Sequence, residues 1–411
     1  MKIQGLDLKD IAEEFGTPLY VYDGQKMKDQ VATFRKAFSG VCIRINYACK
    51  ALTNLSVMKL MKNEGTCLDT VSVPEIRMGL SVGFEPNEII FTPNCVDFSE
   101  IVEAVDLGVN INIENIPNLE KFGKRYGSTV PCCVRMNPFI VSKENSEKVT
   151  WWHKQSKFGI SVSQLEEARS IIDKYGIRVN GLHIHSSSVI MSREIFRKGA
   201  AKVFEIAETF EDLDFVDFGG GVKVRHKVDE DILDIYELAE GLKAEHAAFT
   251  ERYGKEVDLW FEPGRFLVSE SGTLLTRTTM VKTNGERVFA GVDSGFNHLI
   301  RPMFYDAYHE ILNLDNPDGD KATYTVVGNI CEIDNFAVDR ELPEIKEGHL
   351  LALKNTGSYG YVMASNYNSR MRPAEVLVLD GKAHLVRKRD EFEDLVRNQI
   401  VLDFESEKVA E

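Results

Sequence analysis

The stretch Ile43-Arg44-Ile45-Asn46-Tyr47-Ala48-Cys49-Lys50 decides the fold that we expect. Its apolar residues predict a short buried strand that ends on a lysine, and the following Ala51-Leu52-Thr53-Asn54 turns into a helix. Burial at the inner end of such a strand is expected to lower the pKa of the lysine amine and to let it form a Schiff base. Most lysines that close a strand face solvent, so the downstream sequence must decide between the two interpretations.

The same alternation of strand and helix continues along the chain. Helical stretches such as 24–37 and 54–63 lie between short apolar runs. The predicted strands are Ile43–Ala48, Thr66–Asp69, Glu88–Phe91, Val109–Ile113, Pro131–Asn137, Gly181–His185, Phe215–Phe218 and Leu259–Glu262. Eight strands with helical connections over about 240 residues are typical of an α/β protein with a (β/α)8, TIM-like barrel. A doubly wound sheet is the structural alternative.

After Arg265 the pattern changes to short strands at turn spacing. These strands are predicted at 272–281, 288–292, 322–327, 349–353, 375–379 and 383–386. They indicate a C-terminal β-rich domain, sandwich-like or barrel-like, and the N-terminal strand should join it because it precedes the first barrel strand. We therefore expect a barrel over residues 24–270 and a β-rich domain made of 1–23 plus 271–411.

Composition limits the function classes. The net charge of −15 argues against a nucleic-acid or anionic-membrane partner, so an anionic substrate must meet a local basic pocket. The start of the chain lacks the apolar run of a signal peptide, and no window approaches 18 apolar residues. Seven cysteines without a C-x-x-C pair fit reduced thiols, and hence a cytoplasmic protein.

Chemically useful residues follow the last three predicted barrel strands. Gly219-Gly220-Gly221 could bring backbone amides close to an anion, although three glycines more often form a plain turn. Glu262-Pro263-Gly264-Arg265 places an acid and an arginine at the barrel mouth, or else an exposed ion pair. His183 and His185 share one strand face, but no third ligand with suitable spacing follows, so no metal is expected.

Together these strand ends offer an amine, a flat ring, a phosphate cradle, an acid and an arginine. The first and eighth strands of a closed barrel are neighbours, so Lys50 and Glu262 should face one pocket. Pyridoxal 5'-phosphate needs this set of groups: an amine for its aldehyde, a surface to stack on, a phosphate nest and a carboxylate at its ring nitrogen.

With these motifs in view, the chain resembles the alanine-racemase-fold (fold type III) pyridoxal-phosphate-dependent decarboxylases, and within them the diaminopimelate decarboxylase family. The resemblance runs nearly end to end. It rests on Tyr47-Ala48-Cys49-Lys50-Ala51, Leu68-Asp69-Thr70-Val71-Ser72-Val73-Pro74-Glu75, Ser156-Lys157-Phe158-Gly159, Phe218-Gly219-Gly220-Gly221, Glu262-Pro263-Gly264-Arg265, Arg301-Pro302, Gly328-Asn329-Ile330-Cys331-Glu332, Gly357-Ser358-Tyr359-Gly360, Ser365-Asn366-Tyr367-Asn368-Ser369-Arg370 and Arg372-Pro373-Ala374-Glu375-Val376.

The resemblance implies roles for matching residues. Lys50 is expected to be the Schiff-base lysine, His185 to stack on the cofactor and Glu262 to pair with its ring nitrogen. The other residues expected to bind cofactor are Asp69, Ser188, Gly219, Gly220, Gly221, Gly264, Arg265 and Tyr359. Those expected to bind substrate are Arg265, Arg301, Tyr305, Glu332 and Tyr359, and Cys331 is expected to reach in from the partner as proton donor. Without the resemblance, Cys331 is a packing thiol, Glu332 a surface charge and Tyr359 a core aromatic.

The implied reaction is decarboxylation of meso-2,6-diaminopimelate to L-lysine, the last step of lysine biosynthesis, in a homodimer with shared active sites. Two segments differ from the family's usual sequence: Ser186-Ser187-Ser188, and the loop around Trp151-Trp152. They leave a decarboxylase of ornithine, lysine or arginine open as an alternative. A racemase of this fold is less favoured, because the motifs of the β-rich part resemble those of the decarboxylases. A non-catalytic, partner-binding relative is less favoured, because Lys50, Arg265 and Cys331 are all present.

Overall fold

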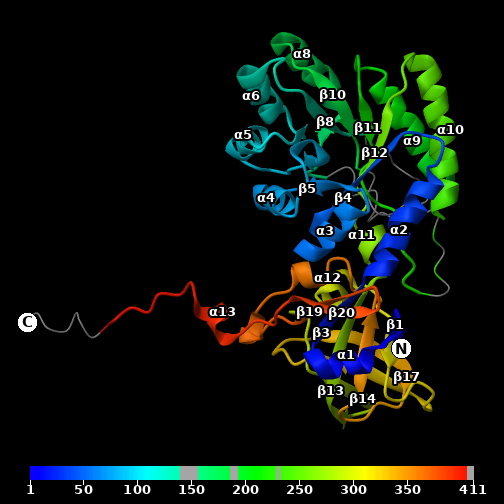
Figure 1. The fold of residues 1–411 in the computed structure, drawn as a ribbon, viewed down its shortest axis with the longest axis vertical. Helices are drawn as coiled ribbons and strands as arrows, with labels where there is room; N and C mark the ends of the chain where they lie inside the picture. The colour runs from blue at the N-terminus through cyan, green and yellow to red at the C-terminus, as the bar shows by residue number, and fades with distance from the viewer. Residues whose placement is uncertain (139–155, 186–192, 228–229, 231, 233, 405–411) are drawn as a thin grey trace, which may run out of the picture. The chain divides into compact units, whose positions relative to one another are not determined.

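A computed structural model describes residues 1–138, 156–185, 193–227, 230, 232 and 234–404 (Figure 1). The chain divides into two compact units. One comprises residues 23–272 together with 355–362, and the other comprises 1–22, 273–354 and 363–411. Each unit is described below on its own.

The first unit is a closed barrel of parallel strands. Its strands are β4 (Ile43–Ala48), β5 (Cys67–Thr70), β6 (Ile89–Phe91), β7 (Asn110–Ile113), β8 (Cys132–Asn137), β10 (Val179–His183), β11 (Phe215–Asp217) and β12 (Asp258–Phe261). Their order is β10-β11-β12-β4-β5-β6-β7-β8, and β8 pairs with β10 to close the ring, while the short β9 (Ile160–Ser161) extends β8. The predicted barrel is confirmed, and the doubly wound alternative is wrong because the sheet has no open edge.

Helices surround this ring of strands (Figure 1). They are α2 (Gly24–Ala37), α3 (Leu55–Asn63), α4 (Val73–Ser81), α5 (Phe98–Asp106), α6 (Ile116–Tyr126), α8 (Leu165–Tyr175), α9 (Arg193–Ala207), α10 (Ile235–Tyr253) and α11 (Arg265–Val268). Several begin on a capping side chain: Asp23 accepts the first amides of α2, Asn54 those of α3 and Asp97 one of α5. Short polar loops thus lead into these three helices.

The barrel interior is filled below those strand ends. Phe215 and Trp260 stack with ring centroids 3.5 Å apart, and the Arg44 guanidinium lies 4.1 Å from the Trp260 ring centroid. Gly181 on β10 makes room for this stack, because a Cβ there would lie 2.2 Å from the Phe215 ring. A ligand must therefore bind at the carboxyl ends of the strands, as in other barrels.

The second unit is built on a nine-stranded sheet. Its strands are β3 (Leu19–Asp23), β13 (Gly272–Asn284), β14 (Arg287–Val292), β15 (Ile311–Asn313), β16 (Lys321–Val327), β17 (Asn335–Pro343), β18 (Leu350–Lys354), β19 (Ala374–Leu379) and β20 (Lys382–Arg387). Since β3 lies between β13 and β19, the prediction that the N-terminal strand joins the β-rich domain is confirmed. β15 and β17 were not predicted.

Short elements complete the β-rich unit: a hairpin of β1 (Lys2–Ile3) and β2 (Leu6–Asp7), and the helices α1 (Leu8–Phe15), α12 (Arg301–Tyr305) and α13 (Phe392–Val396). Leu8 and Ile11 of α1 share one buried apolar cluster with Val21, Leu275 and Val376 of the sheet. None of the helices described here combines the length and the apolar character needed to cross a membrane.

Candidate active site

Lys50 sits at the end of β4, in a single 3-10 turn formed by Cys49–Ala51. Its Nζ lies 2.7 Å from Oδ2 of Asp69, a fully buried residue on the adjacent strand β5, while the Lys50 side chain keeps 31% exposure. Burial acts to lower the pKa of Lys50, but the negative charges of Asp69 and Glu262 outweigh it and hold that pKa above its ordinary value. The expectation of a lowered lysine pKa is therefore wrong, because the amine lies beside carboxylates.

Asp69 shares this environment. Burial, with repulsion from Glu262, raises the pKa of the Asp69 carboxyl to about 7, against the opposing pull of the Lys50 amine. Lys50 and Asp69 thus form an ion pair that anchors the lysine within the barrel mouth as an ammonium. To act as a nucleophile the amine must first give up a proton, and the Asp69 carboxylate is an acceptor within reach.

Glu262 follows β12 and points into the same space from the next strand of the ring. Its Oε1 accepts a hydrogen bond from Thr92 Oγ1 at 3.2 Å, and its Oε2 lies 3.3 Å from His183 Nε2. Burial alone would raise the pKa of this carboxyl, yet His183 and Lys50 hold it below its ordinary range. Glu262 is therefore a buried anion that can pair with a cationic group in the pocket.

Two histidine rings lie beside this anion. His183 is the last residue of β10, and Asn112 Nδ2 lies 2.8 Å from its Nδ1, so a donated amide proton leaves Nε2–H facing Glu262. Burial lowers the pKa of His183, and burial together with Arg135 lowers that of His185 to about 3. Both rings are neutral at physiological pH.

His185 lies beyond the strand that was predicted to contain it, because β10 ends at His183. Its Nδ1 still approaches Glu262 Oε2, at 4.0 Å. Potential ligand atoms of His183, His185 and Glu262 all lie within 4.8 Å of one another, so the structure supplies a third group that sequence spacing did not reveal. These groups already interact with one another at the strand ends, and the absence of a metal stays a prediction.

The glycines after β11 form a bare stretch of backbone at the pocket wall. Gly219 has a positive φ of 65°, and its amide donates to Asp217 Oδ1 at 2.8 Å. A Cβ on Gly219 would lie 2.5 Å from His185 Nδ1, and one on Gly220 would lie 2.7 Å from the Glu262 carbonyl oxygen. Only glycine fits at these positions, and the backbone is open to an anion.

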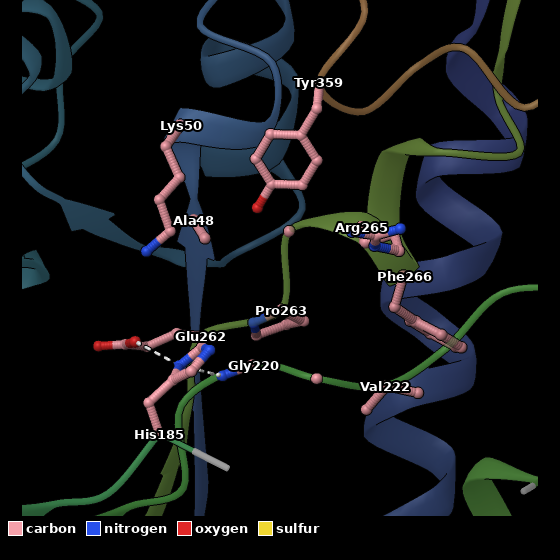
Figure 2. A pocket seen from close by; sticks show the side chains of 12 residues that line it. Ala48, Lys50, His185, Gly220, Val222, Glu262, Pro263, Arg265, Phe266 and Tyr359 are labelled. Carbon is pink, nitrogen blue, oxygen red and sulfur yellow. Dashed lines mark hydrogen bonds and ion pairs between the residues drawn. The ribbon is translucent and has the colours of Figure 1, made fainter. Parts of the chain in front are cut away.

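A pocket with about 500 Å³ of space free of protein atoms brings these groups together (Figure 2). Lys50, His185 and Glu262 line one part of it, and Gly220, Gly221, Gly264 and Arg265 another. Tyr359 reaches the same pocket with its hydroxyl directed inward, and the Arg265 guanidinium lies 5.6 Å from its ring centroid (Figure 2). The backbone amide of Tyr359 donates to the Ala51 carbonyl at 2.8 Å, which ties this distant segment to the Lys50 turn.

The geometry fits pyridoxal phosphate. The Lys50 amine, a buried carboxylate for a protonated ring nitrogen and a neutral imidazole beside that carboxylate lie on one side of the pocket. Glycines without room for side chains, together with an arginine, lie on the other side, where a phosphate needs close donors. These are the groups that the strand-end motifs predicted, and the barrel brings them into one pocket.

Four predicted substrate and catalytic residues lie in the β-rich unit. Arg301 and Tyr305 are the two ends of α12: Arg301 is 5% exposed with its guanidinium 5.6 Å from the Tyr305 ring centroid, and Tyr305 is 53% exposed. Cys331 and Glu332 are both exposed and both contact Tyr367, whose hydroxyl lies 3.7 Å from Cys331 Sγ and 3.2 Å from Glu332 Oε1. Their roles stay predictions, as do those of the barrel residues.

Two predictions fall outside the described residues. Ser188, expected to bind phosphate, and the Trp151–Trp152 loop, expected to influence substrate choice, belong to the stretches 186–192 and 139–155.

Sequence reasoning missed residues that support the site from behind. Thr92 binds Glu262, Asn112 orients His183, and Asp217 accepts the Gly219 amide. Arg135, 8% exposed in the second half of β8, helps keep His185 neutral. A signal was available: each of these residues lies in the second half of a predicted barrel strand or directly after it, near the end where a barrel places its chemistry.

Comparison with known proteins identifies decarboxylases as relatives of this chain. Residues 24–269 match the pyridoxal binding domain of the pyridoxal-dependent decarboxylases. A diaminopimelate decarboxylase of Methanothermobacter thermautotrophicus is 39% identical, over 97% of this chain and 95% of that protein. The crystal structure of the M. jannaschii diaminopimelate decarboxylase in complex with L-lysine superposes with a TM-score of 0.89 at 30% identity, over 97% of this chain and 95% of that one. A lysine/ornithine decarboxylase of Vibrio vulnificus, 21% identical with a TM-score of 0.78 over 91% of this chain and 98% of that one, shares the fold.

Proposed function

The chain belongs to the pyridoxal-dependent decarboxylases, and within them to the diaminopimelate decarboxylase family; from this premise we propose that it decarboxylates meso-2,6-diaminopimelate to L-lysine and CO2. The observation that carries the proposal is the Lys50–Asp69 pair facing an anionic Glu262 across one pocket. Relatives that cover nearly the whole chain bear the same enzyme name, and one solved relative holds L-lysine, the expected product. The reaction is the last step of lysine biosynthesis.

Bound pyridoxal phosphate supplies an electron sink for the bond that is broken to release CO2. Lys50 would provide the amine that holds the cofactor, and Asp69, 2.7 Å from that amine, would take up or return its proton. Glu262, which stays ionised, would hold a proton at the ring nitrogen. His185 would lie beside the ring, and the backbone of Gly219–Gly221 with Arg265 would hold the phosphate.

The β-rich unit supplies the groups that recognise the distal carboxylate and the distal ammonium of the substrate. Arg301 binds the distal carboxylate through a charge-assisted contact, with Tyr305 beside it. Glu332 pairs with the distal ammonium, and Cys331 delivers a proton to the carbon that has lost CO2. We assign Cys331 and Glu332 to the site of the partner protomer, so that the active enzyme is a homodimer with two shared sites.

We place this enzyme in the cytoplasm. All seven cysteines are free in the structure, and four of them are buried or half-buried, as is common in a reducing compartment. The substrate is a small amino acid, and the net charge of −15 requires that its anionic ends be met by local cations such as Arg265 and Arg301.

The activity is tested by measuring amine products from a panel of substrates. With meso-diaminopimelate, ornithine, lysine and arginine at equal concentrations, the cofactor-loaded protein is expected to form L-lysine from the first about 100-fold faster than any product from the others. Loss of a buried charged contact to the distal carboxylate costs about 2–5 kcal/mol, which sets this ratio. A faster reaction with ornithine or arginine would replace the proposal by the basic-amino-acid alternative. No turnover of any of the four substrates would favour a non-catalytic relative.

A further inference from the structure

Cys331 and Glu332 are held by consecutive side chains of one short segment. Asn368 uses both ends of its amide on Cys331: Oδ1 accepts the Cys331 backbone N–H at 2.9 Å, and Nδ2 donates to Cys331 Sγ at 3.1 Å. The preceding residue serves the neighbouring group, since the Tyr367 hydroxyl donates to Glu332 Oε1 at 3.2 Å. The same hydroxyl lies 3.7 Å from Cys331 Sγ.

The backbone of this segment adopts an uncommon conformation that places these side chains. Asn368 and Ser369 have positive φ angles of 56° and 54°, which asparagine adopts more readily than most residues. Two consecutive left-handed residues are unfavourable unless surrounding contacts compensate. One such contact follows directly, because the Arg370 guanidinium donates to the Asn329 carbonyl at 3.2 Å.

A buried carboxylate anchors the Cys331 loop from its other side. Asp334 is 4% exposed, and its two oxygens accept the Phe296 amide at 2.6 Å and the Ile330 amide at 3.2 Å. The Phe296 ring in turn stacks on Tyr367, with centroids 5.7 Å apart. Asp334 and Phe296 therefore connect the loop that carries Cys331 with the Tyr367–Asn368 segment that contacts it.

Resting on the proposed roles of Cys331 and Glu332, we propose that Asn368 and Tyr367 are positioning residues. Asn368 sets the direction of the Cys331 thiol, and Tyr367 fixes the Glu332 carboxylate beside it. A thiol on one rotatable bond samples several staggered rotamers, and simultaneous contact with its backbone N–H and its sulfur selects one of them. Hydrogen bonding to Cys331 and to Glu332 raises the pKa of Tyr367 to about 12, so its hydroxyl keeps its proton and stays a donor at neutral pH.

Each contact has its own functional consequence. A proton donor displaced by about 1 Å can slow a reaction by about 100-fold, so loss of the Asn368 contact should act on kcat. Loss of the Tyr367 hydroxyl should act mainly on KM, because Glu332 is assigned to the distal ammonium and not to the reacting carbon. If both residues served only folding, their substitution would not affect kcat at Asn368 and KM at Tyr367 separately.

The test uses Asn368→Asp in the cofactor-loaded protein, because this change preserves shape and the acceptor for the Cys331 amide. It replaces the donor to sulfur by a carboxylate, which disfavours the thiolate that iodoacetamide needs. We expect alkylation of Cys331, followed by peptide mass spectrometry, to slow about tenfold at neutral pH, with kcat lowered at least about tenfold and KM changed less than about threefold. Cys95, which is exposed on the barrel unit, is the internal reference.

Tyr367→Phe keeps the ring on Phe296 and is expected to raise KM about tenfold with a smaller change in kcat. Asn398→Asp is the matched control: it makes the same charge change at an exposed asparagine of the same unit and should leave both readouts unchanged. An unchanged Cys331 alkylation rate in Asn368→Asp overturns the inference, and so does slower alkylation with normal kcat. If Cys331→Ala keeps full activity, the proposed role of Cys331 itself is overturned. The ratio of the Cys331 to the Cys95 alkylation rate still reports the Asn368 contact separately.

Discussion

Mixing a Lys50→Ala chain with a Cys331→Ala chain is expected to restore activity that neither chain has alone. Lys50→Ala removes the amine that carries the cofactor, and Cys331→Ala removes a proton donor worth about 10²–10⁴ in rate. In a heterodimer with shared sites, one site loses both residues and the other keeps both. Random exchange makes half of the dimers mixed, with one intact site in two, so about a quarter of wild-type activity should return.

The control for this experiment is to show that chains exchange between dimers. Differently tagged chains should be recovered together after mixing, and Lys50→Ala mixed with a double Lys50→Ala/Cys331→Ala chain should stay inactive. Confirmed heterodimers without activity would contradict a shared site and would confine Cys331 to a structural role.

Arg301→Ala is expected to reduce kcat/KM for meso-diaminopimelate by roughly two to three orders of magnitude, from loss of a charged contact worth about 2–5 kcal/mol. Arg301 is only 5% exposed, and a buried arginine is costly unless anions or other acceptors compensate it. Any residual turnover of lysine or ornithine, which lack a second carboxylate, should fall far less. The ratio of the two activities is therefore the measurement.

Arg397→Ala, at an exposed arginine directly after α13 in the same unit, is the matched control and should leave that ratio unchanged. Thermal unfolding of both variants separates a folding defect from a binding defect. Equal proportional loss of both activities in Arg301→Ala would make Arg301 structural and would contradict recognition of a distal carboxylate.

Local sequence pattern was sufficient for the barrel because its strands are short and apolar and helical stretches lie between them. The predicted strand Ile43–Ala48 matches β4, and Leu259–Glu262 differs from β12 by one residue at each end. Residues placed directly after these strands, such as Lys50 and Glu262, were found by the same reasoning. In a parallel barrel, strand order alone fixes that these ends converge.

The pKa of Lys50 could not be predicted from its own strand. It depends on Asp69, on the neighbouring strand, and on Glu262 across the pocket, and their charges reverse the effect of burial. Two strands of the β-rich unit were missed for similar reasons: β15 spans only Ile311–Asn313, and β17 alternates little, since its exposed positions include Asp339 and Glu341.

Residues 355–362 also show what local pattern cannot reveal. They group with the barrel although the surrounding chain does not, and they bring Tyr359 to the pocket. Gly357 makes this possible, because a Cβ there would lie 1.9 Å from the Val268 carbonyl oxygen. Such close backbone approach depends on tertiary contacts, so Tyr359 was predicted from the family resemblance and not from local sequence pattern.

The most direct test of this account is to find the lysine that carries the cofactor. Borohydride makes the link between the cofactor's aldehyde carbon and a lysine amine irreversible, and digestion with peptide mass spectrometry then locates it. We expect one labelled peptide, containing Lys50, because that amine is the one paired with Asp69 and lining the pocket with Glu262 and Gly220. Label on another lysine, or folded protein that takes up cofactor without any label, would contradict the central claim.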